Sequence, residues 1–163
     1  MAKNKEEKTN VMRVLEQKKI AYTAHTYPHE EGMAVDGVTV AQSMGFDPAI
    51  VFKTLVARGA SKQYYVFDVP VAENLDLKKA AKAVGEKSIE MLHQKELLPL
   101  TGYVHGGCSP VGMKKLFPTV FHSSAENLAA MIVSAGKIGY QVELAPHDLA
   151  ALVRAKFADI IVE

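Results

Sequence analysis

VFKTLVAR (residues 51–58) and YYVFDV (residues 64–69) are the two segments that decide the fold. Both are rich in β-branched and aromatic residues, which favour β-strands. The five residues between them, GASKQ (residues 59–63), suit a chain reversal, and Pro70 ends the second segment. The pattern therefore predicts a β-hairpin with a loop longer than the two-residue minimum.

Helical and strand patterns alternate on both sides of this hairpin. Helices are predicted from apolar spacing and capping residues: after Asn10, over residues 39–45, from Asp47-Pro48, over 76–84 and 88–98, and from Pro146. Further strands are predicted over residues 20–27, 119–122, 131–134, 140–144 and 159–162. Because the strands are short and the hairpins local, we expect an α+β fold with a mostly antiparallel sheet that can curl into a barrel, rather than a doubly wound sheet.

Length and charge limit the class of protein. A chain of 163 residues suits one domain, so we expect a charged, flexible segment over residues 1–8 and a single domain over residues 9–163. Nineteen Lys and Arg against eighteen Asp and Glu leave a formal charge of +1, which does not indicate a strongly basic surface for nucleic acid. Six lysines could form a small basic patch for nucleic acid, and a solvated helix face explains the first three equally well: Lys78, Lys79, Lys82, Lys114, Lys115 and Lys137.

Cysteine content and hydropathy bear on the compartment. Cys108 is the single cysteine, so an intrachain disulfide cannot form, which fits a reducing compartment. The chain starts with a polar segment instead of a signal peptide, and no apolar run approaches the ~20 residues of a membrane span. We therefore expect a cytoplasmic protein without a membrane segment.

The sequence gives only weak support for a zinc site or for a catalytic cysteine. His25 and His29 have the i, i+4 spacing of a zinc-binding pair, but they fall on a predicted strand and loop rather than on a helix. Cys108 follows His105 in HGGCSP, a spacing that permits a Cys–His nucleophile. A small buried cysteine is the favoured interpretation of Cys108.

Lys53 and two glycine-bearing segments are the stronger candidates. Alternation puts Lys53 on one strand face with aliphatic neighbours, so its ammonium either stays at a sheet edge or points into a pocket. Gly106-Gly107 permits close approach of a ligand to the backbone, near a helix start if a helix follows Pro110; a plain tight turn is the alternative. SAGKIG (residues 134–139) suits either a turn or one wall of a cleft.

Four segments together resemble the YbaK family, freestanding relatives of the editing domain in bacterial prolyl-tRNA synthetase. They are VFKTL (51–55), KKAAKAVGEKS (78–88), GGCSPVGMKK (106–115) and VSAGKIGYQVEL (133–144). The resemblance covers nearly the whole chain after Lys8. It implies that residues 9–163 form a single aminoacyl-tRNA editing domain, folded as a closed, mixed-strand barrel with flanking helices, without metal or cofactor.

The resemblance also implies roles for individual residues. Lys53 matches the essential lysine of the family, whose ammonium holds the tRNA terminus or the reacting ester. Gly106 and Gly107 match the glycine loop, whose amides bind the aminoacyl carbonyl and the oxyanion formed from it. Substrate-binding positions in the same cleft are Tyr27, Ser134 and Gln141, the last standing where some relatives carry aspartate.

The implied activity is trans-editing, the removal of cysteine from Cys-tRNA(Pro) and also from Cys-tRNA(Cys), assisted by the thiol of the substrate. Prolyl-tRNA synthetase is the expected partner, because a chain with a charge of +1 binds tRNA weakly on its own. The alternatives are an Ala-tRNA(Pro) deacylase, a non-catalytic module that binds aminoacyl-tRNA or a synthetase, and a Cys–His hydrolase of small esters.

Overall fold

The predicted hairpin is the centre of the fold. In this computed structural model, which describes residues 8–29, 33 and 35–163, β2 (Phe52–Gly59) pairs antiparallel with β3 (Tyr64–Pro70). Its register places Lys53 opposite Val69 and Thr54 opposite Asp68. The hairpin prediction is confirmed, including the end of the second strand at Pro70.

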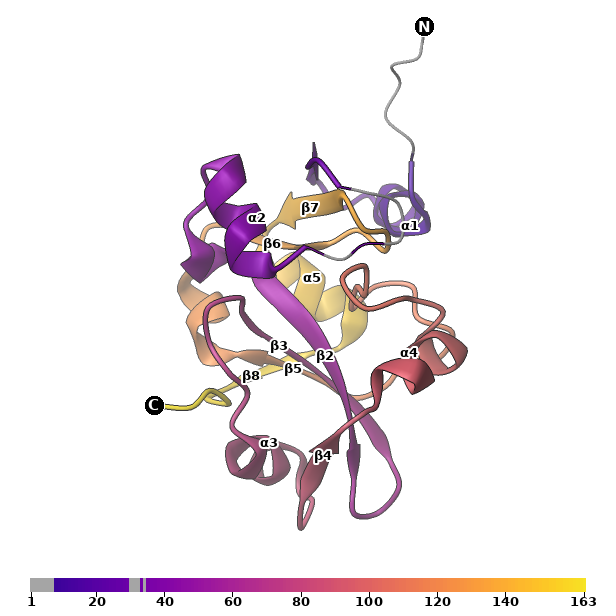
Figure 1. The fold of residues 1–163 in the computed structure, drawn as a ribbon, viewed down its shortest axis with the longest axis vertical. Helices are drawn as coiled ribbons and strands as arrows, with labels where there is room; N and C mark the ends of the chain where they lie inside the picture. The colour runs from indigo at the N-terminus through magenta and orange to yellow at the C-terminus, as the bar shows by residue number, and fades with distance from the viewer. Residues whose placement is uncertain (1–7, 30–32, 34) are drawn as a thin grey trace, which may run out of the picture.

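Five strands form a mixed sheet around this hairpin (Figure 1). The order is β4 (Ile89–Met91), β2, β3, β5 (Thr119–His122) and β8 (Lys156–Ala158). β4 and β3 run antiparallel to β2, whereas the β3–β5 and β5–β8 pairs are parallel. The helix α3 (Leu77–Val84) buries Ala80 and Ala81 against this sheet.

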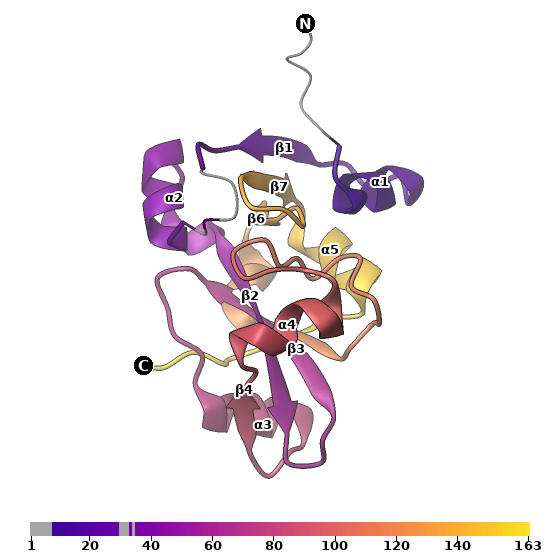
Figure 2. The same ribbon diagram turned by 45° about the vertical axis from the view of Figure 1, so that its right-hand side comes forward.

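Three further strands form a separate antiparallel sheet, which lies above the larger one in Figure 2. Its order is β1 (Thr23–Thr26), β7 (Tyr140–Leu144) and β6 (Met131–Ser134). The main core lies between the two sheets and includes Leu15, Phe121 and Leu149.

The fold is α+β with mixed strands, but the expectation of one sheet curled into a closed barrel is wrong. The described strands divide into two sheets, and no ladder runs around to join their edges. The ladder between β4 and β2 covers Ala57–Gly59 alone, and an isolated bridge from Val51 to Ile132 links β6 with the start of β2. An edge of β2 therefore stays open where a barrel would need a continuous ladder.

The remaining helices and turns cover the sheets. They are α1 (Asn10–Gln17), α2 (Gly37–Met44), α4 (Gln94–Thr101), α5 (Pro146–Val153) and the short 3₁₀ helices η2 (Pro48–Ile50) and η3 (Ser123–Asn127). The predicted 88–98 helix is wrong in its first part, which is strand β4, while α4 covers its last part from Gln94. Residues 1–7 of the predicted flexible segment lie outside the described residues, and Lys8 forms an ion pair with Glu16 at 2.9 Å.

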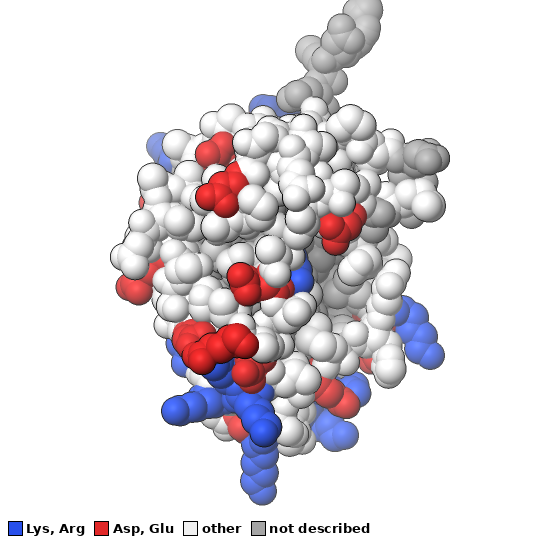
Figure 3. All heavy atoms as spheres, turned by 60° about the vertical axis from the view of Figure 1, so that its left-hand side comes forward, with Lys and Arg blue, Asp and Glu red and all other residues white. Residues whose placement is uncertain are grey.

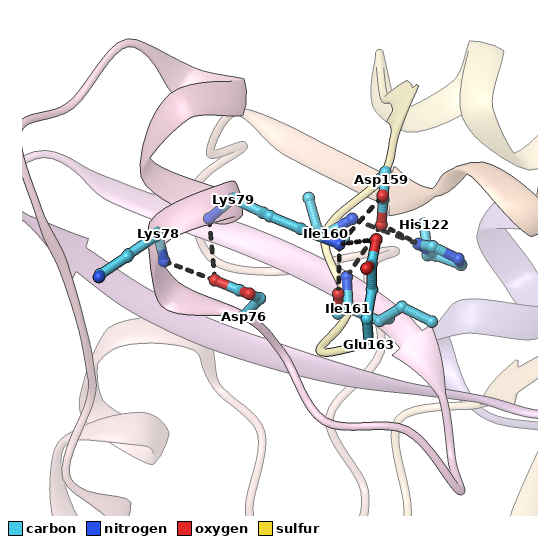
Figure 4. A network of polar contacts seen from close by, with 8 residues as sticks. All are labelled: Asp76, Lys78, Lys79, His122, Asp159, Ile160, Ile161 and Glu163. Atoms are coloured by element: carbon cyan, nitrogen blue, oxygen red, sulfur yellow. Dashed lines mark hydrogen bonds and ion pairs between the residues drawn. The ribbon is translucent and has the colours of Figure 1, made fainter.

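A polar network fixes the C-terminal segment to α3 (Figure 4). The Lys79 ammonium donates to Asp159 Oδ2 at 3.1 Å, to the Ile161 carbonyl at 2.9 Å and to Glu163 Oε2 at 3.2 Å. These contacts lie at the exposed edge of the larger sheet, so they stabilise the fold rather than shape a pocket. Within the part of the chain that the structure describes, no helix is long and apolar enough to cross a membrane.

Candidate functional site

A pocket of about 490 Å³ opens where the two sheets, α2 and the loop after α4 meet. This volume falls in the range of small-molecule sites, roughly 300–1,000 Å³. Its floor is the start of β2, the part of the strand that β4 leaves uncovered. Figures 1 and 2 show the loop that follows α4 between that helix and the smaller sheet.

Five of the six residues predicted for the site line this pocket: Tyr27, Lys53, Gly106, Ser134 and Gln141. They come from β2, from the loop after α4, from β6 and β7, and from the segment just after β1. The sixth, Gly107, lies next to the pocket, buried behind the lining. Residues spread over most of the chain are thus brought to one place.

Lys53 supplies the positive charge of the pocket. Its side chain is half-buried, and desolvation lowers the pKa of the ammonium, an effect that the negative charges of Asp36 and Glu73 oppose. Asp36 lines the pocket and caps α2 by accepting from the Thr39 N–H at 3.1 Å. Among the described residues no carboxylate lies within 4.0 Å of the Lys53 ammonium, so this cation is available to a ligand.

The two glycines of the loop differ in what they do. Gly106 is exposed, lines the pocket and has φ of +89°, a conformation that favours glycine. The Gly107 amide donates to the Val104 carbonyl at 3.0 Å, and a Cβ at Gly107 would lie 3.0 Å from the backbone nitrogen of Ile138. No helix follows Pro110, so the condition for a helix start near these amides is not met. Gly107 instead lets the loop pack closely against the β6–β7 turn.

The smaller sheet contributes polar groups to the opposite wall. Ser134 and Gln141 are cross-strand neighbours on β6 and β7. The Ser134 hydroxyl accepts from the Gly136 N–H at 3.3 Å, which leaves its own proton free to be donated. Gln141 Oε1 is buried and has no hydrogen-bond partner among the described residues. A ligand that donates a hydrogen bond here would satisfy a group that is costly to leave unpaired.

Cys108 lies in the pocket wall but lacks the properties of a nucleophile. Burial raises the pKa of its thiol to about 12, with a smaller contribution from the charge of Asp68. The thiol is therefore protonated at neutral pH, whereas a cysteine nucleophile needs a lowered pKa. His105 also lines the pocket, yet it does not offset the burial of Cys108.

The histidine pair considered for zinc is engaged elsewhere. His25 Nε2 contacts Glu143 Oε1 at 2.8 Å across β1 and β7, and His29 Nδ1 donates to the Tyr27 carbonyl at 3.1 Å. The part of the chain that the structure describes holds no cluster of three or more His, Cys, Asp or Glu side chains arranged to bind a metal.

Sequence reasoning missed two polar residues beneath the pocket. Thr54 lines the pocket, and its hydroxyl donates a hydrogen bond to Asp68 on β3. Asp68 is fully buried, and burial raises the pKa of its carboxyl to about 7. A signal was present, because an aspartate interrupts the apolar segment YYVFDV.

Known proteins resemble this chain in sequence and in fold. The family described as aminoacyl-tRNA editing domain matches residues 29–152. An Enterococcus faecalis protein named "Putative Cys-tRNA(Pro)/Cys-tRNA(Cys) deacylase EbsC" is 47% identical over 161 residues, which covers 98% of each chain.

Solved structures give the same picture. One described as "a putative trans-editing enzyme for prolyl tRNA synthetase" has a TM-score of 0.78 at 25% identity, covering 94% of this chain and 95% of that one. The hypothetical protein APE2540 has a TM-score of 0.82 at 18% identity, covers 93% of this chain and 99% of its own, and supports the fold alone. By the family match and the 47% identical relative, this chain belongs to the aminoacyl-tRNA editing domain family, the YbaK family that its motifs resemble.

Proposed function

We propose that this chain is an aminoacyl-tRNA deacylase that removes cysteine from Cys-tRNA(Pro) and from Cys-tRNA(Cys). The observation that carries the proposal is the convergence of Lys53, Gly106, Ser134 and Tyr27 on one pocket. The family and the deacylase name of the 47% identical relative support the same activity. A tRNA substrate would place this activity in the cytoplasm.

The proposed reaction needs no nucleophile from the protein. The substrate thiol loses its proton to solvent, and the resulting thiolate attacks the carbonyl carbon of its own ester. The bond from that carbon to the 3′ oxygen of the tRNA breaks, and this oxygen takes up a proton from solvent. Cysteine leaves as a thiolactone. The Lys53 ammonium and the backbone at Gly106 would stabilise the negative charge that develops on the carbonyl oxygen. The raised pKa of Cys108 fits this route, since its thiol has no part in it.

Prolyl-tRNA synthetase is the proposed partner. The formal charge of the chain is +1, and phosphate contacts supply most of the affinity of proteins for nucleic acid. Figure 3 shows a face on which Lys and Arg gather at the end that carries α3, while most of the surface above that end is uncharged. A synthetase that holds the tRNA would supply the missing affinity and select the tRNA.

A panel of charged tRNAs tests the proposal. We expect rapid deacylation of Cys-tRNA(Pro), while Ala-tRNA(Pro) and Pro-tRNA(Pro) decay at the rate seen in buffer, because their side chains carry no thiol. Adding prolyl-tRNA synthetase is expected to raise the rate on Cys-tRNA(Pro) relative to Cys-tRNA(Cys).

The outcomes of the panel separate the alternatives. Preferential loss of alanine would identify an Ala-tRNA(Pro) deacylase. Saturable tRNA binding without faster ester loss would identify a binding module. Unchanged selectivity in the presence of the synthetase would remove the proposed partner while leaving the activity in place.

A further inference from the structure

Asp68 occupies an unusual position for a carboxylate. It has no exposed surface, and its Oδ2 atom has no hydrogen-bond partner among the described residues. The other oxygen, Oδ1, accepts a hydrogen bond from the hydroxyl of Thr54, its register neighbour on β2. Burying a carboxylate with so few partners is costly, so a functional reason is worth seeking.

Thr54 connects this buried group with the pocket. Thr54 lines the pocket floor, one residue after Lys53. A threonine hydroxyl has one proton and two lone pairs. While the proton is donated to Asp68, the lone pairs of Thr54 are left as acceptors for a ligand.

The surroundings of Asp68 favour a cationic donor as that ligand. Cys108 is the titratable group whose pKa responds to the Asp68 charge. Its thiol has a pKa of about 12 and stays neutral, so it does not balance the charge of Asp68. The second unpartnered buried acceptor, Gln141 Oε1, belongs to the same pocket. The titratable residues of the pocket lining are Tyr27, Asp36, Lys53, His105 and Cys108. An aminoacyl ester brings one cationic donor, its α-ammonium group.

We propose that Asp68 is a positioning residue that acts through Thr54, fixing the Thr54 hydroxyl as an acceptor for the α-ammonium of the aminoacyl ester. This inference rests on the proposed deacylase function. In it, the Thr54 hydroxyl, fixed by Asp68, holds the amino end of the substrate, while Lys53 serves the carbonyl end. The two contacts then orient one small substrate across the pocket.

The protonation of Asp68 controls this arrangement. Burial raises the pKa of Asp68 to about 7, so at pH 8 the carboxylate accepts from Thr54. At pH 6 the carboxyl is mostly protonated and can donate to Thr54 instead, which turns the Thr54 proton toward the pocket. The contribution of Thr54 to ammonium binding is therefore present above pH 7 and lost below it.

The test compares Cys-tRNA(Pro) with N-acetyl-Cys-tRNA(Pro), which lacks the ammonium. The proteins are the wild type, Thr54→Val, Thr54→Ser, Asp68→Val and the Thr54→Val/Asp68→Val double variant, and kcat and KM are measured at pH 8. We expect the wild type to prefer the substrate with an unblocked α-amino group by about 10-fold in kcat/KM, in line with the loss of one hydrogen bond. Thr54→Ser keeps this preference, whereas the two valine variants and the double variant lose it equally.

Asp68→Asn supplies a second measurement that does not depend on the folding of Asp68→Val. The amide oxygen still accepts from Thr54 but does not titrate, so the preference for the free amine persists at both pH 6 and pH 8, while that of the wild type falls at pH 6. Equal losses on both substrates, additive losses in the double variant, or the same pH response in Asp68→Asn and wild type would overturn the inference alone. A wild type that releases no cysteine overturns the proposed function together with the inference.

Discussion

Replacing Lys53 with alanine is expected to slow cysteine release from Cys-tRNA(Pro) by about 100-fold or more, the usual effect of removing one group that stabilises an oxyanion. Lys53 is the positive charge in the pocket lining, and within the described residues it has no ion-pair partner that would compete with a substrate. Because the ammonium is partly desolvated, its interaction with a developing negative charge is stronger than it would be in water.

Two control variants make this result specific. Lys78→Ala removes an exposed lysine from α3, away from the pocket, and tests whether charge alone matters. Cys108→Ala removes the thiol in the pocket wall, and we expect its activity to stay within about 3-fold of wild type, because the raised pKa keeps this thiol neutral. Full activity in Lys53→Ala, or loss confined to Cys108→Ala, would contradict the proposed mechanism.

The second large effect is expected from Gly107→Ala. The added Cβ would meet three backbone atoms of the β6–β7 turn: Ile138 N at 3.0 Å, and Lys137 C and Cα at 3.2 Å each. Because backbone atoms yield little, the loop that carries Gly106 must shift relative to the β6–β7 turn, which changes the position of the Gly106 backbone in the pocket. We expect at least about 10-fold lower kcat/KM on Cys-tRNA(Pro), together with about 1–3 kcal/mol lower stability, as for other overpacked sites.

Gly85→Ala is the matched control for this variant. Gly85 ends α3 with φ of +74°, and a Cβ there meets no atom within 4 Å. The backbone strain costs about 1 kcal/mol but leaves the pocket untouched. Thermal unfolding and deacylation are measured on both variants. If Gly85→Ala loses as much activity as Gly107→Ala, general destabilisation and not loop displacement explains the loss.

Local patterns predicted the fold best where one chemical rule dominates. The hairpin around residues 59–63, the helix from Asp76 to its glycine end and the strand of residues 140–144 follow directly from turn, capping and alternation rules. The 88–98 segment was misjudged because its apolar spacing fits a helix, whereas pairing of Ile89 with Gly59 makes its start a strand. Such pairing is a tertiary effect that the local pattern does not contain.

Local sequence patterns could not predict whether the sheet closes into a barrel. Whether strands join into a barrel depends on contacts between distant segments, and among the described residues an isolated bridge between Val51 and Ile132 is the backbone link between the two sheets. The residues of the pocket could also be predicted only in part from local sequence patterns. Lys53 and the glycine loop stand out in sequence, but nothing local pairs Thr54 with Asp68, since the strand register creates that contact.

The most direct test of the account compares two esters on one tRNA, Cys-tRNA(Pro) and Ser-tRNA(Pro), at equal concentrations of the wild-type chain. Serine replaces the substrate sulfur with oxygen and changes the size of the side chain little, while its hydroxyl is a far weaker nucleophile at neutral pH. We predict that the cysteinyl ester is cleaved at least about 100-fold faster than the seryl ester. Equal rates for the two esters would show that the thiol of the substrate takes no part, and would contradict the account.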